Sequence, residues 1–316
     1  MMTHTAIANV NIALIKYWGK KDIEWNLPLT SSISLTLDAF YTKTTVTYDP
    51  TLTADILLID DEIITGGEYL RVTKYMDKLR KLYSIPFYAK ITSYNFVPKK
   101  AGLASSSSAF AALAYAATKA YGLNLDSKEL SSLARLGSGS ASRSIYGGLV
   151  LWHEGHDHMS SYAEHLTHMD DLAVIVCLID ETPKKVNSTD AMNRLNEYPD
   201  LKELWILSTQ DALNDMKEAI IENDFDKMGS IAESHASLMH YIIQETGVSY
   251  LTDQSFKVMD LTEKIRNEGI PVYYTMDAGA NVKILTKKEY VETIKARYEK
   301  LSKVIVSYTG MGVSSL

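Results

Sequence analysis

Short apolar runs separated by polar clusters dominate the first third of the chain, a pattern typical of β-strands. Thr, Val and Ile are frequent within these runs, and Asp or Gly residues lie between them. The alternation predicts strands at 12–17, 33–37, 43–48, 54–59 and 89–94. Residues 70–83 carry instead the periodicity of an amphipathic helix. The N-terminal region is therefore expected to be built around a sheet.

An alanine-rich segment predicts a long helix in the middle of the chain. It opens at the serines of 105–108, and Gly122 is a suitable residue to end it. Asp126, followed three residues later by Glu129, is a capping-box variant that begins a second helix, which we expect to end at Gly137. Two further strands are expected at 144–152 and 172–179.

Helices dominate the remainder of the chain. They are expected at 199–223, 225–245, 253–269 and 288–301, with strands at 272–276, 282–286 and 303–307. Strands and helices that mix without regular alternation indicate an α+β fold rather than a doubly wound sheet. Near residues 180–187 the pattern changes from one rich in strands to one rich in helices. We therefore expect an N-terminal domain at 1–183 and a C-terminal domain at 184–316.

Composition limits the class of protein and the compartment. The chain has 316 residues, 46% hydrophobic and 22% charged, so two domains with sizeable cores are expected. No run approaches the roughly 18 apolar residues of a membrane span, and no secretory signal pattern is visible. Cys177 is the only cysteine, which excludes an intrachain disulfide and fits a cytoplasmic protein. The net charge of −7 argues against non-specific binding of nucleic acid.

Three local motifs are rich in groups that bind anions. Segment 98–108, Pro-Lys-Lys-Ala-Gly-Leu-Ala-Ser-Ser-Ser-Ser, feeds a helix N-terminus that suits phosphate, although an ordinary serine-capped helix is the alternative. It lacks the Gly-Lys-Ser/Thr of a Walker A loop. Segment 137–143, Gly-Ser-Gly-Ser-Ala-Ser-Arg, offers the guanidinium of Arg143 to an anion, or else forms a polar turn. Segment 16–20, Lys-Tyr-Trp-Gly-Lys, either binds a ligand or ends a strand with two solvated lysines.

Two further groups are candidates for chemistry. Asp277 follows a predicted strand and opens a turn of small residues, where a carboxylate can act as a base or merely cap the turn. Five of the eight histidines fall between His153 and His168. Their spacing lacks the helical His-Glu-x-x-His pattern of zinc sites, so a polar loop is favoured and no dedicated metal ligand is assigned.

Taken together and in this order, five motifs make the chain resemble the mevalonate diphosphate decarboxylases of the GHMP kinase superfamily. The Gly-Ser loop marks the superfamily, whereas Lys-Tyr-Trp-Gly-Lys and Met-Asp-Ala-Gly are specific to the decarboxylases. The motifs are Asn-Ile-Ala-Leu-Ile-Lys-Tyr-Trp-Gly-Lys at 11–20, Ser-Ser-Ile-Ser-Leu-Thr-Leu at 31–37, Ala-Gly-Leu-Ala-Ser-Ser at 101–106, Gly-Ser-Gly-Ser-Ala-Ser-Arg-Ser at 137–144 and Tyr-Thr-Met-Asp-Ala-Gly at 274–279.

This resemblance covers nearly the whole chain. It implies a two-domain α+β fold with a ribosomal-protein-S5-domain-2-like N-terminal half, a ferredoxin-like C-terminal half and an active site in the cleft between them. It also implies ATP and Mg²⁺, mevalonate 5-diphosphate as substrate, and a family that often forms homodimers. The ATP-binding positions implied are Ser93, Asn95, Ala101, Gly102, Leu103, Ala104, Ser105, Ser106 and Ser107. The substrate-binding positions are Tyr17, Trp18, Gly19, Lys20, Arg71, Ser138, Gly139, Ser140, Ala141, Ser142, Arg143, Ser188 and Thr189.

The implied reaction transfers the γ-phosphoryl group of ATP to the 3-hydroxyl of the substrate, after which phosphate and CO₂ leave and isopentenyl diphosphate forms. Catalysis of phosphoryl transfer rests on positioning and on charge stabilisation. The resemblance assigns Asp277 to orient or deprotonate the hydroxyl and Arg143 to hold the substrate carboxylate. It places Lys20 near Asp277 and the transferring phosphoryl oxygens. The reaction belongs to the mevalonate pathway of isoprenoid biosynthesis.

The chain departs from the family pattern at several positions. Lys99 and Lys100 precede the nucleotide loop in place of Thr and Ala, segment 186–192 lacks one serine and one glycine, and His235 replaces an asparagine. Two alternatives therefore stay open: a kinase of the same superfamily that does not decarboxylate, and a catalytically inactive, ligand-binding relative. The intact set of implied catalytic residues argues against both.

Overall fold

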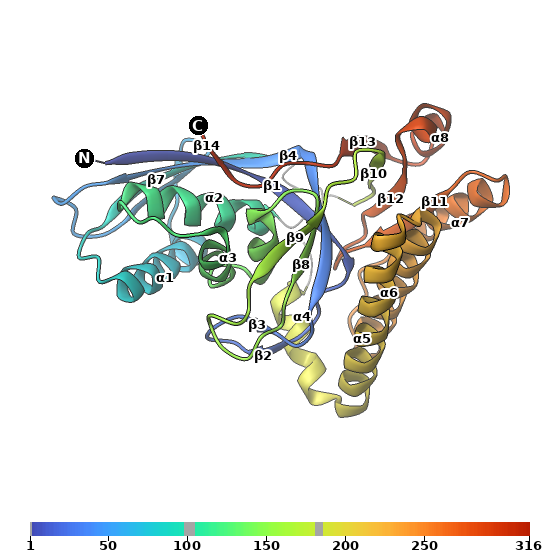
Figure 1. The fold of residues 1–316 in the computed structure, drawn as a ribbon, viewed down its shortest axis with the longest axis horizontal. Coiled ribbons are helices and arrows are strands. Elements are labelled where there is room, and N and C mark those ends of the chain that lie inside the picture. Colours follow the sequence, from blue (N-terminus) through green and yellow to red (C-terminus); the bar gives the residue numbers. More distant parts are fainter. Residues whose placement is uncertain (1, 98–104, 181–185) are drawn as a thin grey trace.

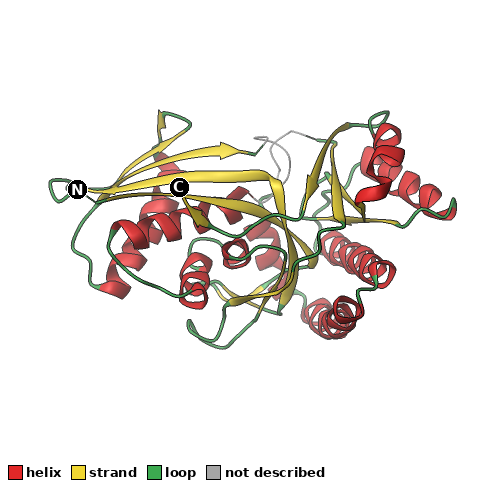
Figure 2. Ribbon diagram, turned by 45° about the horizontal axis from the view of Figure 1, so that its top comes forward, coloured by secondary structure: helices red, strands yellow, loops and turns green. Residues whose placement is uncertain are grey.

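The computed structural model of the protein describes residues 2–97, 105–180 and 186–316. Within these residues an eight-stranded sheet and a four-stranded sheet organise the chain, so the predicted α+β class is confirmed. In Figure 1, α1, α2 and α3 lie on one side of the larger sheet, whereas α5, α6 and α7 lie with the smaller sheet at the other end. Figure 2 shows the same two groups of helices from another side.

The larger sheet has a central path and a side branch. Its path runs β14-β1-β4-β7-β5-β6, and β8 pairs with β4 and with β9. Its strands are β1 (Thr3–Ile15), β4 (Ser32–Tyr48), β5 (Ile56–Ile59), β6 (Glu62–Ile63), β7 (Ala89–Phe96), β8 (Leu149–Trp152), β9 (Ala163–Thr167) and β14 (Ser314–Ser315). The second sheet runs β11 (Val272–Met276), β12 (Val282–Lys287), β10 (Leu172–Leu178), β13 (Lys303–Tyr308). A separate hairpin joins β2 (Lys20–Asp22) and β3 (Leu27–Pro28).

Helices cover both sheets. They are α1 (Gly66–Tyr83), α2 (Ser105–Ala120), α3 (Ser127–Arg135), α4 (Ser188–Arg194), α5 (Pro199–Glu222), α6 (Phe225–Glu245), α7 (Asp253–Asn267) and α8 (Val291–Tyr298). Short 3₁₀ segments lie at η1 (Gly139–Ile145), η2 (Leu195–Glu197) and η3 (Lys288–Tyr290). Among the described residues no helix is both long and apolar enough to cross a membrane.

The alanine-rich helix packs as its composition predicts. Helix α2 lies against β1 and β4, and Ala112 and Ala116 are fully buried in that contact. Small side chains let the helix approach the sheet closely. The predicted capping box also forms, since the Asp126 carboxylate accepts from the N–H of Glu129 at 2.8 Å and the Glu129 carboxylate accepts from the N–H of Asp126.

The two halves share a continuous apolar core. One cluster of buried side chains includes Ile12 of β1, Leu35 of β4 and Val174 of β10, so it contains residues of both sheets. A second cluster lies between the larger sheet and α1 to α3, and a third lies behind the second sheet. The shared cluster fixes how the halves face each other, and this determines the shape of the cleft between them.

Several predicted elements differ in the structure. The strands expected at 33–37 and 43–48 form one strand, β4. The exposed Asp38 and Ala39 lie at an irregularity in its pairing with β1, and the pairing resumes on both sides, at Thr36 with Asn11 and at Tyr41 with Asn9. The strand expected at 144–152 begins only at Leu149, since η1 occupies the residues before Tyr146. Strand β9 and helix α4 were not predicted; both are short and carry few apolar residues.

The predicted domain boundary between 183 and 184 lies outside the described residues. Strand β10 pairs with β12 and β13 of the second sheet. Sheet pairing therefore groups β10 with the C-terminal half and favours a division between β9 and β10. The domain limits stay a prediction.

Candidate active site

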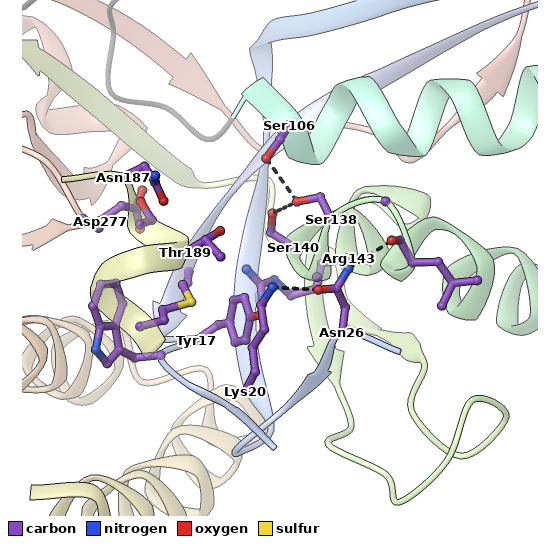
Figure 3. Close-up of a pocket in the computed structure, with 18 of the residues that line it drawn as sticks. Tyr17, Lys20, Asn26, Ser106, Ser138, Ser140, Arg143, Asn187, Thr189 and Asp277 are labelled. Carbon is purple, nitrogen blue, oxygen red and sulfur yellow. Dashed lines mark hydrogen bonds between the residues drawn. The ribbon is translucent and has the colours of Figure 1, made fainter. Parts of the chain in front are cut away.

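A cavity of about 840 Å³ opens between the two halves of the molecule. The N-terminal half contributes residues 16–18 and 20, part of α1, the start of α2 and residues 136–140 and 143. The C-terminal half contributes α4, Met239 of α6 and the turn at Asp277. Figure 3 shows these side chains converging on one space. The cleft expected between the halves is therefore present.

The Asp277 corner consists of Asp277 and Lys16, which line the cavity, and of Lys283, which contacts Asp277 without lining the cavity. Asp277 directly follows β11, and one carboxylate oxygen accepts from Lys16 Nζ at 3.0 Å while the other lies 3.2 Å from Lys283 Nζ. Both lysine side chains are 1% exposed, whereas that of Asp277 is 23% exposed. Lys16 comes from the end of β1 and Lys283 from β12, so the corner joins the two sheets.

Electrostatics in this corner favour an ionised carboxylate. Burial by itself would raise the pKa of Asp277, but the two adjacent ammonium groups hold that pKa well below its usual range. The pKa of Lys16 is lowered to about 8, mainly by burial; Asp277 opposes this shift, and the charges of Lys283 and Arg143 add to it. Asp277 is therefore an acceptor of hydrogen bonds and only a weak base.

The lysines around Asp277 differ from the expectation. Lys20 Nζ donates instead to Asn26 Oδ1 at 2.7 Å, and Figure 3 shows this bond directed away from Asp277. Gly19, at φ +90°, turns the chain between Lys16 and Lys20, so that Lys20 begins the β2–β3 hairpin. The expectation that Lys20 is the lysine beside Asp277 is therefore corrected to Lys16 and Lys283. A catalytic role of Lys20 stays a prediction.

Arg143 is held rigidly at the base of the cavity. Its Nε donates to Asn11 Oδ1 at 3.2 Å, its Nη1 donates to Ser32 Oγ at 2.6 Å, and its guanidinium lies 5.6 Å from the Trp152 ring centroid. Burial lowers its pKa to about 10, so it stays charged near neutral pH. A guanidinium has more N–H donors than these two bonds use, which leaves capacity for an anionic ligand.

Three serine hydroxyls form a row above Arg143. Ser106 Oγ lies 3.1 Å from Ser138 Oγ, which lies 3.3 Å from Ser140 Oγ (Figure 3). Gly139 sits between them, and a Cβ there would come within 2.9 Å of the Tyr17 hydroxyl. The small residues of this segment therefore let its backbone pack tightly against neighbouring side chains. Ala141 and Ser142, by contrast, are buried below the cavity, and Ser142 Oγ donates to the Gly139 carbonyl.

Four cations also line the cavity, Lys20, Arg71, Lys74 and Lys78, and together they are called the α1 wall. Three of these cations lie on α1, at the three- and four-residue spacing that places them on one face. Arg71 is exposed, donates to the Gly137 carbonyl at 3.2 Å and lies over the Phe110 ring. Burial, together with the charges of Arg71 and Lys78, lowers the pKa of Lys20. The wall is a cluster of cations suited to a multiply charged anion.

The remaining predicted substrate residues have different surroundings. The Tyr17 hydroxyl is buried and, within the described residues, has no hydrogen-bond partner, so a ligand can satisfy it. Trp18 packs in an apolar cluster with Leu195 and Met239 while its edge still lines the cavity. Ser188 and Thr189 open α4 and line the cavity from the C-terminal half.

A second cavity of about 130 Å³ adjoins the first, with Arg71 and Ser106 lining both. Its lining includes Ser93 and Asn95, together with apolar side chains of β5, α1 and α2. Ser107 is fully buried and does not line this cavity. Ser105 begins α2, whereas the predicted loop residues Ala101, Gly102, Leu103 and Ala104, and the two lysines Lys99 and Lys100, lie outside the described residues.

Comparison with known proteins finds two family models that match this chain, one in each half. The family model named "Diphosphomevalonate decarboxylase-like N-terminal domain" matches residues 8–163, and "Mevalonate 5-diphosphate decarboxylase C-terminal domain" matches residues 174–310. The chain belongs to the diphosphomevalonate decarboxylase family.

Individual relatives agree with this assignment. The chain is 41% identical to mevalonate diphosphate decarboxylase from Staphylococcus aureus, with a TM-score of 0.96 over 100% of this chain and 98% of that one. It is 39% identical to MDDEF in complex with MVAPP, AMPPCP and magnesium, with a TM-score of 0.95 over 100% and 99% of the two chains. Diphosphomevalonate decarboxylase from Ganoderma lucidum is 34% identical, over 92% of this chain and 80% of that protein. The two-domain GHMP kinase fold is therefore confirmed.

One relative carries a different substrate in its name. Phosphomevalonate decarboxylase from Haloferax volcanii is 30% identical, over 93% of this chain and 91% of that protein. Family membership therefore does not decide whether the substrate carries one phosphate group or two, and the charge of the α1 wall bears on this choice.

The sequence motifs contained Lys16 but gave it no role, and they missed Lys283. Lys283 stands between Val282 and Ile284 in an apolar strand, where an ordinary surface lysine is not expected. A lysine buried in such a pattern is the signal that could have pointed to a partner carboxylate.

Proposed function

We propose that the protein catalyses the ATP-dependent decarboxylation of (R)-mevalonate 5-diphosphate, forming isopentenyl diphosphate, ADP, phosphate and CO₂. The observation that carries this proposal is one cavity in which an ionised Asp277, a rigid Arg143 and a wall of cations face one another. A pure kinase needs an acceptor for the hydroxyl proton but no cation for a carboxylate. Membership of the decarboxylase family supports the same conclusion.

Asp277 is proposed to orient the 3-hydroxyl of the substrate. Its carboxylate accepts the hydroxyl hydrogen bond, and the proton passes to it as the oxygen bonds to the γ-phosphorus and the bond to ADP breaks. In a loose transition state the attacking oxygen forms little bond to phosphorus, so the reaction depends only weakly on the strength of the base. A carboxylate of low pKa is therefore sufficient. Lys16, 3.0 Å from the carboxylate, stands where its charge stabilises the transferring phosphoryl oxygens.

Arg143 is proposed to hold the carboxylate of the substrate. When the bond between C3 and the phosphorylated oxygen breaks, positive character develops at C3. The bond between C2 and the carboxylate carbon then breaks, its electron pair forms the double bond between C2 and C3, and CO₂ leaves. The bonds from Arg143 to Asn11 and Ser32 keep the guanidinium in place, so its geometry needs no rearrangement during these steps.

The α1 wall and the serine row are proposed to bind the phosphate chain. Four cations carry more positive charge than the roughly two negative charges of one phosphate group, so the diphosphate is favoured over the monophosphate. The alternative substrate, mevalonate 5-phosphate, is kept because a relative carries that name and because segment 186–192 departs from the family pattern.

ATP is proposed to occupy the second cavity, with its phosphates directed toward Ser106 and the start of α2. The position of Ser93 and Asn95 in that cavity and the helix N-terminus beside it support this. Mg²⁺ neutralises part of the triphosphate charge when it enters with ATP. Among the described residues no group of three or more His, Cys, Asp and Glu side chains could hold the ion alone.

A cytoplasmic location and assembly into a homodimer are also proposed, on the resemblance and the single cysteine alone. Size-exclusion chromatography with light scattering tests the homodimer.

The activity is tested by incubating the purified protein with ATP, Mg²⁺ and mevalonate 5-diphosphate while ADP and CO₂ are measured together. We expect one CO₂ for each ADP. A parallel reaction with mevalonate 5-phosphate, expected at least tenfold lower in kcat/KM, decides between the two phosphate chains. ADP with a stable 3-phosphorylated product and no CO₂ would show a kinase instead. No turnover with either substrate, despite ATP binding, would favour the inactive relative.

A further inference from the structure

Helix α6 carries two buried histidines that contact the backbone of the Asp277 corner. His235 and His240 are 3% and 7% exposed. One contacts Lys16 and the other contacts Asp277, so a single helix touches both members of the ion pair. Neither histidine lines the cavity, so neither is a candidate for direct contact with a ligand.

His235 accepts a hydrogen bond from the backbone of Lys16. The Lys16 N–H lies 2.9 Å from His235 Nδ1, which must therefore be unprotonated. The ring proton is then on Nε2, 3.1 Å from Thr209 Oγ1, and Thr209 donates in turn to the Trp205 carbonyl at 2.6 Å. The Trp205 ring lies against the imidazole, with centroids 4.7 Å apart. His235 is thus fixed in one tautomer and one orientation.

This bond satisfies a group that the sheet leaves open. Strand β1 ends at Ile15, whose partner on β4 is Ile33, and Lys16 follows directly. The N–H of Lys16 has passed the end of the ladder, and a buried N–H without a partner is costly. The imidazole of His235, from the opposite half of the molecule, supplies the acceptor. This bond fixes the position of the Lys16 backbone relative to α6.

His240 holds the other partner. Its Nε2 lies 3.1 Å from the carbonyl oxygen of Asp277, and because a carbonyl only accepts, the imidazole donates. The N–H of Gly279 donates to the same carbonyl at 2.6 Å, which closes the turn after β11. The backbone of Asp277 is therefore tied both to its own turn and to α6.

We infer that His235 and His240 are positioning residues, which fix the backbones of Lys16 and Asp277 against one helix and so set the approach of ammonium and carboxylate. This inference rests on the proposed function. A misplacement of about 1 Å can lower a rate a hundredfold, so a shared anchor has a direct effect on turnover. It also gives a reason for the histidine that stands where relatives are expected to have asparagine, because an amide oxygen can accept the same N–H.

Both histidines stay neutral across the working pH range. The charged group facing His235 is Lys16, and burial together with this charge lowers the pKa of His235 to about 3. The groups facing His240 are Asp277, Lys16 and Lys283, and burial is the main cause that lowers its pKa to about 4. The two anchors therefore do not titrate between pH 5 and pH 9.

The test compares His235→Leu, which cannot accept a hydrogen bond, with His235→Asn, which can. We expect His235→Leu to lower kcat roughly ten- to a hundredfold with KM values changed less than about twofold, and His235→Asn to recover to within about threefold of wild type. In a Lys16→Met background the same His235→Leu change should lower kcat by less than about twofold, because the residue it positions is already gone. His240→Leu and His240→Gln form the corresponding pair for Asp277.

Three results would overturn the inference: equal losses in the Leu and Asn variants, full addition of the His235→Leu loss to that of Lys16→Met, or unchanged kcat. His158→Leu, at a partly buried histidine that contacts Arg135, is the control for the general cost of such a change. A crystal structure of His235→Leu decides independently of activity, since the 3.0 Å approach of Lys16 to Asp277 should lengthen. An inactive wild-type protein would contradict the proposed function. The distance between Lys16 and Asp277 in the His235→Leu variant would still test whether His235 positions Lys16.

Discussion

The cations of the Asp277 corner and those of the α1 wall differ in whether they have a carboxylate as partner. At the Asp277 corner, two buried ammonium groups contact one carboxylate, at 3.0 and 3.2 Å. At the α1 wall, Arg71 and Lys74 are exposed, and among the described residues no ion pair with a carboxylate involves any of the wall's four cations. The corner is neutralised largely from within, whereas the wall can be neutralised by a ligand.

This difference separates catalysis from binding. Charges that are fixed before the reaction need no rearrangement in the transition state, so the corner is expected to act on kcat. Cations without an ion pair gain a counter-ion only when an anion binds, and their contribution is screened by salt. The α1 wall is therefore expected to act on KM and to weaken as ionic strength rises. The predictions below test this separation.

The largest effect is expected at Asp277. Asp277→Asn keeps the shape of the side chain but leaves Lys16 and Lys283 buried without their counter-ion and removes the proton acceptor. We expect kcat to fall at least about a hundredfold, the scale for a positioned acid–base group, with ATP affinity unchanged. Steady-state kinetics and calorimetric titration of ATP measure the two quantities. Turnover within about tenfold of wild type would mean that Asp277 only caps its turn.

Asp190→Asn is the matched control for this change. Asp190 also lines the cavity, but its carboxylate accepts from Asn187 Nδ2 at 2.7 Å rather than from a buried lysine. We expect its kcat to stay within about threefold of wild type, as for a surface polar change. A loss as large as that of Asp277→Asn would show that any carboxylate of the cavity matters equally.

Arg143→Gln should have the second largest effect. An amide cannot make two parallel charge-assisted bonds to a carboxylate, so both the position of the substrate and the release of CO₂ suffer. We expect kcat/KM to fall roughly thirty- to a hundredfold, with ADP and CO₂ still formed in equal amounts. Kinetics like those of wild type would place Arg143 outside the chemistry, as a support for Asn11 and Ser32.

At the α1 wall, Lys20→Met tests whether this lysine binds or catalyses. Lys20 bonds to Asn26 and not to Asp277, so we expect KM for mevalonate 5-diphosphate to rise about tenfold with kcat nearly unchanged. The rise should shrink at high salt. Lys81→Met, on α1 but outside the cavity, is the control and should leave both constants unchanged. A fall in kcat at constant KM would restore the catalytic role first assigned to Lys20.

The sequence predicted the parts of the site that depend on local order. The turn at Asp277, the Gly-Ser segment at 137–143 and the alanine-rich helix are all read from short windows, and the structure brings them to one cleft. The α+β class followed from the same local patterns. The short, polar helix α4 was not predicted from the sequence, although Asn187 caps it by accepting from the N–H of Asp190.

Contacts between the halves could not be read in this way. Lys16 and Lys20 stand in one motif, and only the turn at Gly19 sends one to Asp277 and the other to Asn26. The meeting of Lys16 with Asp277 depends on how the two sheets pack, across more than half of the chain. Single-sequence patterns carry no information on such pairs, and the family resemblance placed Lys20 beside Asp277, where the structure has Lys16.

The smallest effect at neutral pH, and the sharpest test of the corner, is expected from Lys283→Met. Burial and the charge of Lys283 both lower the pKa of Lys16, which is about 8. Loss of the Lys16 proton above that pH should lower kcat/KM, which reports the free enzyme. Removing the second cation raises the pKa of Lys16, so the alkaline limb of the profile should move to higher pH. At pH 7, where Lys16 is protonated in both proteins, kcat/KM should differ less than about threefold.

Lys287→Met, on the same strand but outside the cavity, is the control and should leave the alkaline limb in place. Methionine matches the length of lysine and is apolar, so it fits the buried position of Lys283 without a new unpaired charge. If the alkaline limb of the Lys283→Met profile moved to lower pH, the change would be opposite to the expected one. It would mean that Lys283 stabilises the charged form of Lys16 through Asp277. A limb that stays near pH 8 would assign it to another group, and the corner would then lack the coupling between its two lysines that its geometry requires.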